Sequence, residues 1–149
     1  MTTQRQQLGD FGESRVSQNC CCPRCKRKKT LVRLPKNFKC ADIICDFCGY
    51  LGQVKTATAQ DISAIPKKIL GAAWEPQRKR MDAGIYFPLF LVLATESLEQ
   101  YAIHYLSADL QQPEMFVPRK PLSPNARRAG WTGFMYDLEP VHSSFVRLK

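Results

Sequence analysis

The chain has 149 residues, 44% of them hydrophobic, and this length and composition suit one globular domain with a buried core. Its longest apolar run, ten residues from Ile85, includes Pro88 and is too short to cross a bilayer. The N-terminus is polar and lacks the apolar stretch of a secretion signal, so we expect a cytoplasmic protein without a membrane anchor.

Positive charge is concentrated in the first part of the chain. The net charge is +9, and residues 1–60 carry 11 Lys and Arg against 4 Asp and Glu, whereas residues 61–149 carry 11 against 9. A basic region of this kind favours a polyanionic partner such as double-stranded DNA. A solvated basic face that aids solubility is the alternative.

Hydrophobic periodicity and turn residues predict a mixed α/β protein. The predicted elements, in chain order, are a helix at residues 8–19, strands at 30–34, 38–44 and 52–59, a helix at 65–84, a buried strand from Ile85, and strands at 99–108 and 131–138. Pro66 would open the second helix and Gly84 would stop it. Pro76 would break or kink it.

Seven cysteines without a secretion signal indicate metal ligation rather than disulfides. Cys22-x2-Cys25 and Cys45-x2-Cys48 are separated by 19 residues, a spacing typical of a structural zinc site with four thiolate ligands. Gly49 permits the left-handed backbone that such a tight knuckle needs. We therefore predict zinc knuckles at residues 20–25 and 45–48, and a thioredoxin-like redox pair is the weaker alternative.

Three cysteines are left over: Cys20, Cys21 and Cys40. Either Cys20 or Cys21 could replace Cys22 as a ligand, although neither would form the same turn. Cys40 is expected to pack as a small hydrophobic residue within its strand.

Three polar residues flank the second cysteine pair. Asp42 ends one predicted strand, and Gln53 and Lys55 share one face of the next strand because side chains alternate along a strand. If the knuckle turns the chain between the two strands, Asp42 faces Gln53 and Lys55. A carboxylate, an amide oxygen and a lysine together could bind Mg²⁺ and a water molecule beside a phosphate, whereas a surface Asp and Lys on a hairpin is the simpler interpretation.

The stretch from Asp42 to Lys55, D-x10-Q-x-K, resembles the signature of the PD-(D/E)xK nuclease superfamily. With its two cysteines it is similar, more narrowly, to the catalytic domain of Dam-replacing restriction endonucleases. "GDFGE" in the first helix and "PLSPNARRAGWTGF" near the end fit the same resemblance. It implies a restriction-endonuclease-like αβββαβ core with a mixed central sheet and a four-cysteine zinc-binding insertion, as a single domain over residues 1–149.

The resemblance also implies roles for individual residues. Asp42 would be the principal Mg²⁺-binding carboxylate, and Gln53 and the main-chain carbonyl of Val54 would be further ligands. Lys55 would position and polarise the attacking water, with Glu13 as a secondary acid from the first helix. The usual residue at position 53 of the pattern is Glu. Mrr-like restriction enzymes also use Gln, but a neutral amide adds no charge, so weaker cation binding or an inactive site is the alternative.

The expected function is therefore a Mg²⁺-dependent DNA endonuclease of a restriction or defence system, and the alternative is a zinc-ribbon nucleic-acid-binding protein without catalysis. Methylation-specific members can carry a winged-helix domain after the nuclease, for which this sequence leaves no room, so methyl-adenine dependence is not assumed. Cleavage of both strands favours a homodimer or sequential nicking by a monomer. The candidate phosphate-binding residues are Arg24, Lys26, Arg27, Lys28, Lys29, Arg127 and Arg128.

Overall fold

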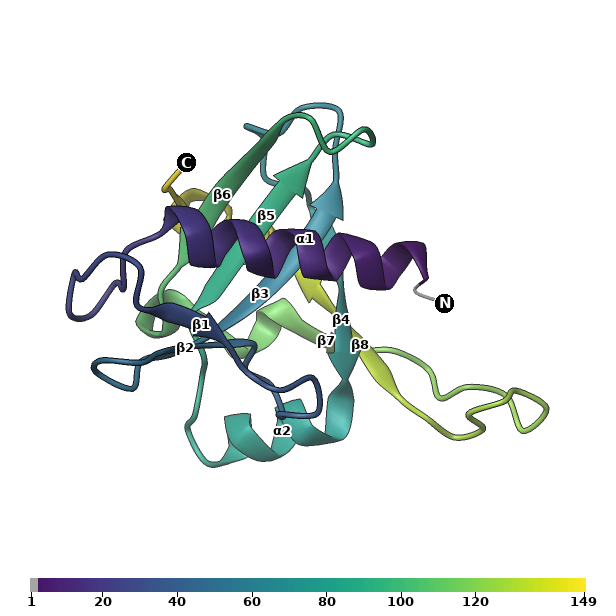
Figure 1. Cartoon of the computed structure of the whole chain (residues 1–149). Coiled ribbons are helices and arrows are strands. Elements are labelled where there is room, and N and C mark those ends of the chain that lie inside the picture. Colours follow the sequence, from purple (N-terminus) through teal and green to yellow (C-terminus); the bar gives the residue numbers. More distant parts are fainter. Residues whose placement is uncertain (1–2) are drawn as a thin grey trace. The chain divides into compact units, whose positions relative to one another are not determined.

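The structure is a computed structural model that describes residues 3–149, and it confirms the mixed α/β class (Figure 1). The helices and strands, in chain order, are α1 Gln4–Asn19, β1 Leu31–Arg33, β2 Ile43–Cys45, β3 Leu51–Thr58, β4 Lys68–Ala73, α2 Trp74–Asp82, β5 Leu89–Ala94, β6 Tyr101–Leu106, β7 Phe116–Pro118, β8 Gly133–Asp137 and β9 Val146–Arg147. Three short 3-10 helices cover Ala108–Leu110, Pro113–Met115 and Glu139–Ser144. None of the helices within residues 3–149 has the length and apolar composition needed to span a bilayer.

The chain divides into two compact units, one of which holds the cysteine pairs and the Asp42–Lys55 stretch. This first unit comprises the residues up to Ala64, Phe87–Ala108 and Phe145–Lys149. Its six-stranded sheet has the order β1-β2-β3-β5-β6-β9. β3 and β5 are parallel, whereas the other neighbours are antiparallel, so the predicted mixed central sheet is confirmed.

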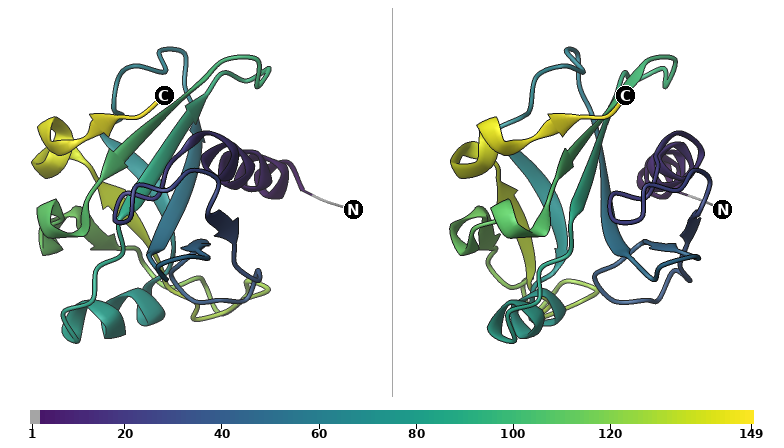
Figure 2. Two further views of the ribbon diagram at one scale, coloured as in Figure 1. Left: turned by 60° about the vertical axis from the view of Figure 1, so that its left-hand side comes forward. Right: turned by 90° about the vertical axis from the view of Figure 1, so that its left-hand side faces the viewer.

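Helix α1 lies along one face of this sheet (Figure 2). A capping box begins the helix, in which Gln6 N donates to Thr3 Oγ1 and Thr3 N donates to Gln6 Oε1. Val16 is fully buried against the sheet, in a core that also contains Val54 and Phe90. Burying a side chain of this size stabilises a fold by about 1.5–3 kcal/mol.

Gly12 sets how closely α1 approaches β3. A Cβ atom built at Gly12 would lie 1.7 Å from Oγ1 of Thr56 on β3, far inside van der Waals contact. Because glycine has no side chain, the helix backbone can rest directly on the strand. This close approach fixes the position of the next residue, Glu13, relative to the sheet.

The second unit comprises Ile65–Tyr86 and Asp109–Ser144 and contains a three-stranded sheet of order β4-β8-β7. Its core is aromatic: the rings of Phe134 and Tyr136 lie 4.9 Å apart, and the ring of Phe116 lies 5.4 Å from that of Tyr136. Contacts of this kind each contribute about 0.5–1.5 kcal/mol beyond the burial of area.

Two predicted elements are corrected. The helix predicted at residues 65–84 is wrong in its first half, because Lys68–Ala73 forms strand β4, paired antiparallel with β8. Pro76 then falls in the first turn of α2, where a missing N–H removes no helical hydrogen bond, and Gly84, with φ of 74°, follows the helix end as predicted. The strand predicted at 38–44 is shorter, because Cys40 has the left-handed φ of 65° and the regular strand begins at Ile43.

Candidate functional site

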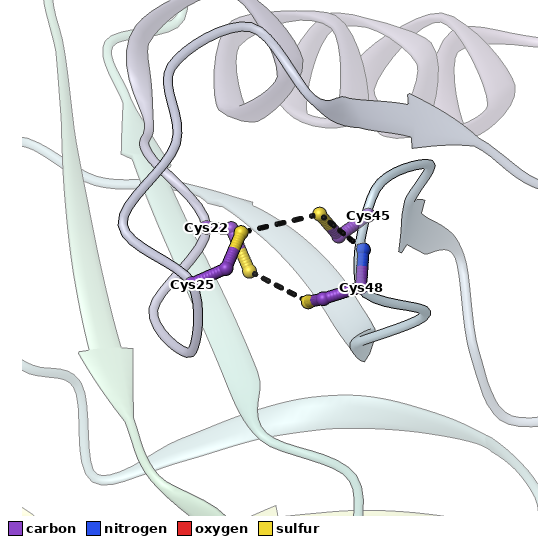
Figure 3. Close-up of side chains that lie close together, drawn as sticks. All are labelled: Cys22, Cys25, Cys45 and Cys48. Atoms are coloured by element: carbon purple, nitrogen blue, oxygen red, sulfur yellow. Dashed lines mark hydrogen bonds between the residues drawn. The ribbon is translucent and has the colours of Figure 1, made fainter.

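The four thiols of Cys22, Cys25, Cys45 and Cys48 converge on one point between two loops (Figure 3). All four sulfur atoms lie within 4.8 Å of one another, with 3.6 Å from Cys22 to Cys48 and 3.7 Å from Cys25 to Cys45. Tetrahedral coordination with Zn–S bonds of about 2.3 Å would place the sulfurs about 3.8 Å apart. The cluster can therefore hold a tetrahedral metal ion such as zinc, and the convergence of both pairs leaves the redox interpretation without a basis.

The two cysteine loops share one backbone design. Lys26 N donates to the carbonyl of Cys22 and Gly49 N donates to that of Cys45, each at 2.9 Å. The residue after each pair has a left-handed backbone, with φ of 65° at Lys26 and 80° at Gly49. The sequence indicated this conformation at Gly49, whereas Lys26 carries it without the freedom of glycine.

The surroundings of Cys45 favour the thiolate form that a metal ion needs, whereas burial raises the pKa of the neighbouring Cys48 thiol. Burial opposes ionisation of Cys45, but a hydrogen bond with Thr30 Oγ1 and the N–H groups of Cys48 and Phe47 lower the pKa of this thiol to about 6. Thiolates ligate metal ions, so such a shift prepares the site for binding near neutral pH.

The remaining cysteines lie outside the cluster. Cys22 belongs to the cluster, so neither Cys20 nor Cys21 takes its place. Cys20 is buried, and burial, together with neighbouring Cys21, raises the pKa of its thiol to about 11. Cys40 lies in the loop before β2 rather than inside a strand, which corrects the prediction for this residue.

The second knuckle forms the turn of a hairpin, as the sequence predicted. Ile43 of β2 lies opposite Gly52 of β3, and Asp42 N donates to the carbonyl of Gly52 at 2.9 Å. The pairing of β2 with β3 does not continue beyond this point, so the N–H of Val54 is available to another acceptor. Asp42 Oδ2 accepts that hydrogen bond at 2.8 Å, which fixes the carboxylate beside β3.

Three ionisable groups interact around this hairpin. Burial raises the pKa of Asp42, opposed by the Val54 N–H and by the charges of Lys55 and Arg33. Burial and the charge of Asp42 raise the pKa of Glu13. Burial lowers the pKa of Lys55, opposed by the charges of Asp42, Cys40 and Glu13. The structure thus brings Asp42, Glu13 and Lys55 within electrostatic range of one another. Gln53, which is buried, lies on β3 together with Lys55.

A pocket of about 190 Å³ opens beside these acids, between α1 and the segment that follows β1. Asp10, Glu13, Arg33 and Asp42 line it. Arg33 Nη2 lies 2.7 Å from Asp10 Oδ1, and Arg33 Nε lies 3.2 Å from Glu13 Oε1. The sequence analysis missed Asp10 and Arg33 as site residues, although Asp10 belongs to the "GDFGE" stretch that resembles the nuclease family.

The basic residues predicted to contact DNA are exposed in both units. Arg24, Lys26, Arg27, Lys28 and Lys29 lie together in the first knuckle and the loop after it, and Arg127 and Arg128 lie in the loop before β8 of the second unit. The guanidinium of Arg27 lies 3.8 Å from the ring centre of exposed Phe47, and that of Arg128 lies 4.6 Å from the ring centre of Trp131. The structure does not assign a ligand to either set.

The mixed sheet, the first helix and the four-cysteine cluster define a restriction-endonuclease-like α/β protein. The sequence model of the DpnI, Dam-replacing family matches residues 1–147, and the chain belongs to this family. The family indicates a restriction-type nuclease with DNA as its substrate, which favours the nuclease over a zinc ribbon without catalysis.

Proposed function

We propose that the protein is a Mg²⁺-dependent DNA endonuclease of a restriction system, with Asp42, Gln53, Lys55 and Glu13 as its catalytic residues. One observation carries the proposal: the knuckle hairpin holds the Asp42 carboxylate on the N–H of Val54 at 2.8 Å, beside the strand that bears Gln53 and Lys55. The four-cysteine cluster would be a closed, structural zinc site that fixes this hairpin.

The donor atoms around Asp42 fit a hard cation. The Asp42 carboxylate, the Gln53 amide oxygen and the Val54 carbonyl are oxygen ligands, the type that Mg²⁺ takes, and Mg²⁺ needs only one or two carboxylates. Burial raises the pKa values of Asp42 and Glu13, and the charge of Asp42 raises that of Glu13 further; a divalent cation would relieve both effects. When bound, Mg²⁺ would neutralise charge on the phosphate and help to form the attacking hydroxide.

Lys55 would act on the attacking water. The Lys55 side chain is half-buried, and its ammonium group interacts electrostatically with Asp42 and Glu13, an attraction that would hold it toward the proposed cation site. An ammonium donor at this place can orient the water and stabilise negative charge that develops on the phosphate. Asp42, anchored through Oδ2 to the main chain, would keep its place during the reaction.

The basic loop of the first knuckle would bind the DNA backbone. Its five exposed cations, Arg24, Lys26, Arg27, Lys28 and Lys29, belong to the same unit as the proposed catalytic residues. Each phosphate contact lowers the slope of log K against log salt by about 0.9. Arg127 and Arg128 would add contacts from the second unit. Cleavage of both strands, in the cytoplasm, would follow from two copies or from successive nicks.

The test is cleavage of supercoiled plasmid, adenine-methylated and unmethylated, with Mg²⁺ or with EDTA. Wild-type protein should nick or linearise plasmid in Mg²⁺ alone, and Lys55→Ala should abolish cleavage while zinc content and melting temperature stay unchanged. Lys79→Ala, which removes an exposed lysine of α2, is the matched control and should cleave like wild type. Cleavage retained by Lys55→Ala contradicts the assigned site, and DNA binding without cleavage by wild type favours a non-catalytic protein.

A further inference from the structure

Arg33 is the cation that already occupies the acidic pocket. Its guanidinium contacts Asp10 at 2.7 Å and Glu13 at 3.2 Å, and the same pocket is lined by Asp42. The three side chains of this bridge are between 21% and 40% exposed, so the guanidinium remains open to solvent and to a ligand. Arg33 comes from β1, whereas both acids come from α1, so the contact ties the helix to the edge of the sheet.

Arg33 and a divalent cation would compete for Glu13. Oε1 of Glu13 accepts the hydrogen bond from Arg33 Nε, and a carboxylate bound to a nearby divalent ion would no longer favour a full positive charge beside it. Asp10 is bound by a different nitrogen, Nη2, and this contact can persist when Nε is released. A guanidinium has five N–H donors in a rigid fork, so a released Arg33 keeps donors for a second anion.

The pocket has room for that second anion. Its volume of about 190 Å³ corresponds to roughly six water molecules at about 30 Å³ each. This is enough for one phosphate group beside a cation that keeps only part of its water shell. Arginine forks pair with phosphate through two parallel hydrogen bonds, which position a phosphate more precisely than a lysine does.

We propose that Arg33 is a positioning residue with two partners. In the metal-free protein it pairs with Glu13 in place of the divalent cation. Once the cation binds Glu13, Arg33 binds a phosphate of the DNA. The proposal rests on the nuclease function proposed above. In this exchange Arg33 keeps its contact with Asp10, whereas Glu13 changes its partner from Arg33 to the cation. The two states of Arg33 would couple cation binding to DNA binding.

The test is Mn²⁺ binding to the protein without DNA, measured by titration calorimetry, for wild type, Arg33→Ala, Arg33→Lys and Lys36→Ala. Lys36 lines the same pocket, but Glu13 pairs with Arg33, so the Lys36 variant controls for a general loss of positive charge. Arg33→Ala should bind Mn²⁺ roughly tenfold more tightly than wild type, equivalent to about 1.4 kcal/mol, because Glu13 loses its competing partner. Lys36→Ala should change this affinity by less than about twofold.

The two Arg33 variants should also bind DNA more weakly than wild type. With Ca²⁺ in place of Mg²⁺, Arg33→Ala should bind DNA at least about fivefold more weakly, and Arg33→Lys, which keeps the charge without the fork, should lie between it and wild type. Tighter Mn²⁺ binding together with weaker DNA binding supports the exchange. Unchanged or weaker Mn²⁺ binding by Arg33→Ala overturns it, as does equal tightening by Lys36→Ala.

Failure of this inference can be separated from failure of the nuclease proposal. If wild type binds Mn²⁺ and cleaves plasmid but Arg33→Ala binds Mn²⁺ no more tightly, the exchange alone is wrong. If wild type neither binds Mn²⁺ nor cleaves, the nuclease proposal itself is wrong, and this inference is overturned with it. Should Arg33→Ala not fold, Arg33→Gln keeps most of the side-chain volume and carries the same comparison.

Discussion

Gly12→Ala should destabilise the protein, because the new methyl group would push α1 away from the sheet. The new Cβ would lie 1.7 Å from Oγ1 of Thr56 and 3.0 Å from its Cβ, so turning the hydroxyl away cannot remove the whole clash. Overpacking of this kind costs about 1–3 kcal/mol, and the depth of the overlap places it near the upper end. Alanine recovers about 1 kcal/mol of helix propensity, which leaves a net destabilisation of about 2 kcal/mol.

Gly9→Ala is the matched control, because Gly9 lies one turn earlier in α1 and its Cβ would meet nothing within 4 Å. The free energy of unfolding of this variant should rise by about 1 kcal/mol, so the two variants should differ in stability by about 3 kcal/mol. For a chain of this size that difference corresponds to about 6–12 °C in melting temperature. Urea unfolding of wild type, both variants and Gly12→Ala/Thr56→Ala measures it, and the double variant should recover part of the loss.

Equal stability of Gly12→Ala and Gly9→Ala would refute the close approach of α1 to β3. A second readout links the packing to the site. Because Glu13 follows Gly12 directly, displacement of the helix should reduce plasmid cleavage under conditions where Gly12→Ala remains folded. Full activity of a destabilised Gly12→Ala would show that the position of Glu13 does not matter for the reaction.

Cys45→Ser should lose the bound metal ion, measured by atomic absorption, and should melt well below wild type, whereas Cys21→Ser, at an exposed position outside the cluster, should change neither. Equal metal content in both variants would contradict the assignment of the ligands. Lys26→Gly should stabilise the zinc-loaded protein by about 1 kcal/mol in urea unfolding, because glycine adopts the left-handed backbone without strain, while Lys28→Gly serves as the control and should give no gain. Asp42→Asn should stabilise the metal-free protein at pH 7. Because the pKa of Asp42 is raised in the folded state, wild type loses stability as the pH rises through that pKa. The stability advantage of the variant should therefore disappear in acid. A pH-independent difference in the free energy of unfolding would contradict that reasoning.

The elements that the sequence predicted well are those whose signal is local. The spacing of the cysteine pairs indicated their convergence, because each C-x2-C turn directs two thiols to one side. The hairpin that brings Asp42 to β3 followed from a turn between two alternating strands, and the register of Ile43 with Gly52 confirms it. The buried strand β5 was visible as an apolar run, and all six of its residues are buried.

The errors arose where distant contacts override local preference. Leu70, Ala72 and Ala73 favour a helix, yet this stretch pairs with β8, and the ring of Phe134 lies where a side chain at Gly71 would be. Arg33 offered no signal, because one arginine in a short strand gains a role only when α1 places Asp10 and Glu13 beside it.

The four-cysteine cluster changes what a chelator experiment can mean for this protein. EDTA would remove a divalent ion from the acidic pocket and, given time, zinc from the four-cysteine cluster, which takes two of its thiolates from the turn of the hairpin that follows Asp42. The two losses differ in how they recover. A protein that has lost only the pocket ion should regain cleavage as soon as Mg²⁺ is supplied in excess, whereas one that has lost zinc should need zinc and time to refold. Inhibition by EDTA therefore identifies the reaction's cation only when Mg²⁺ alone reverses it at once.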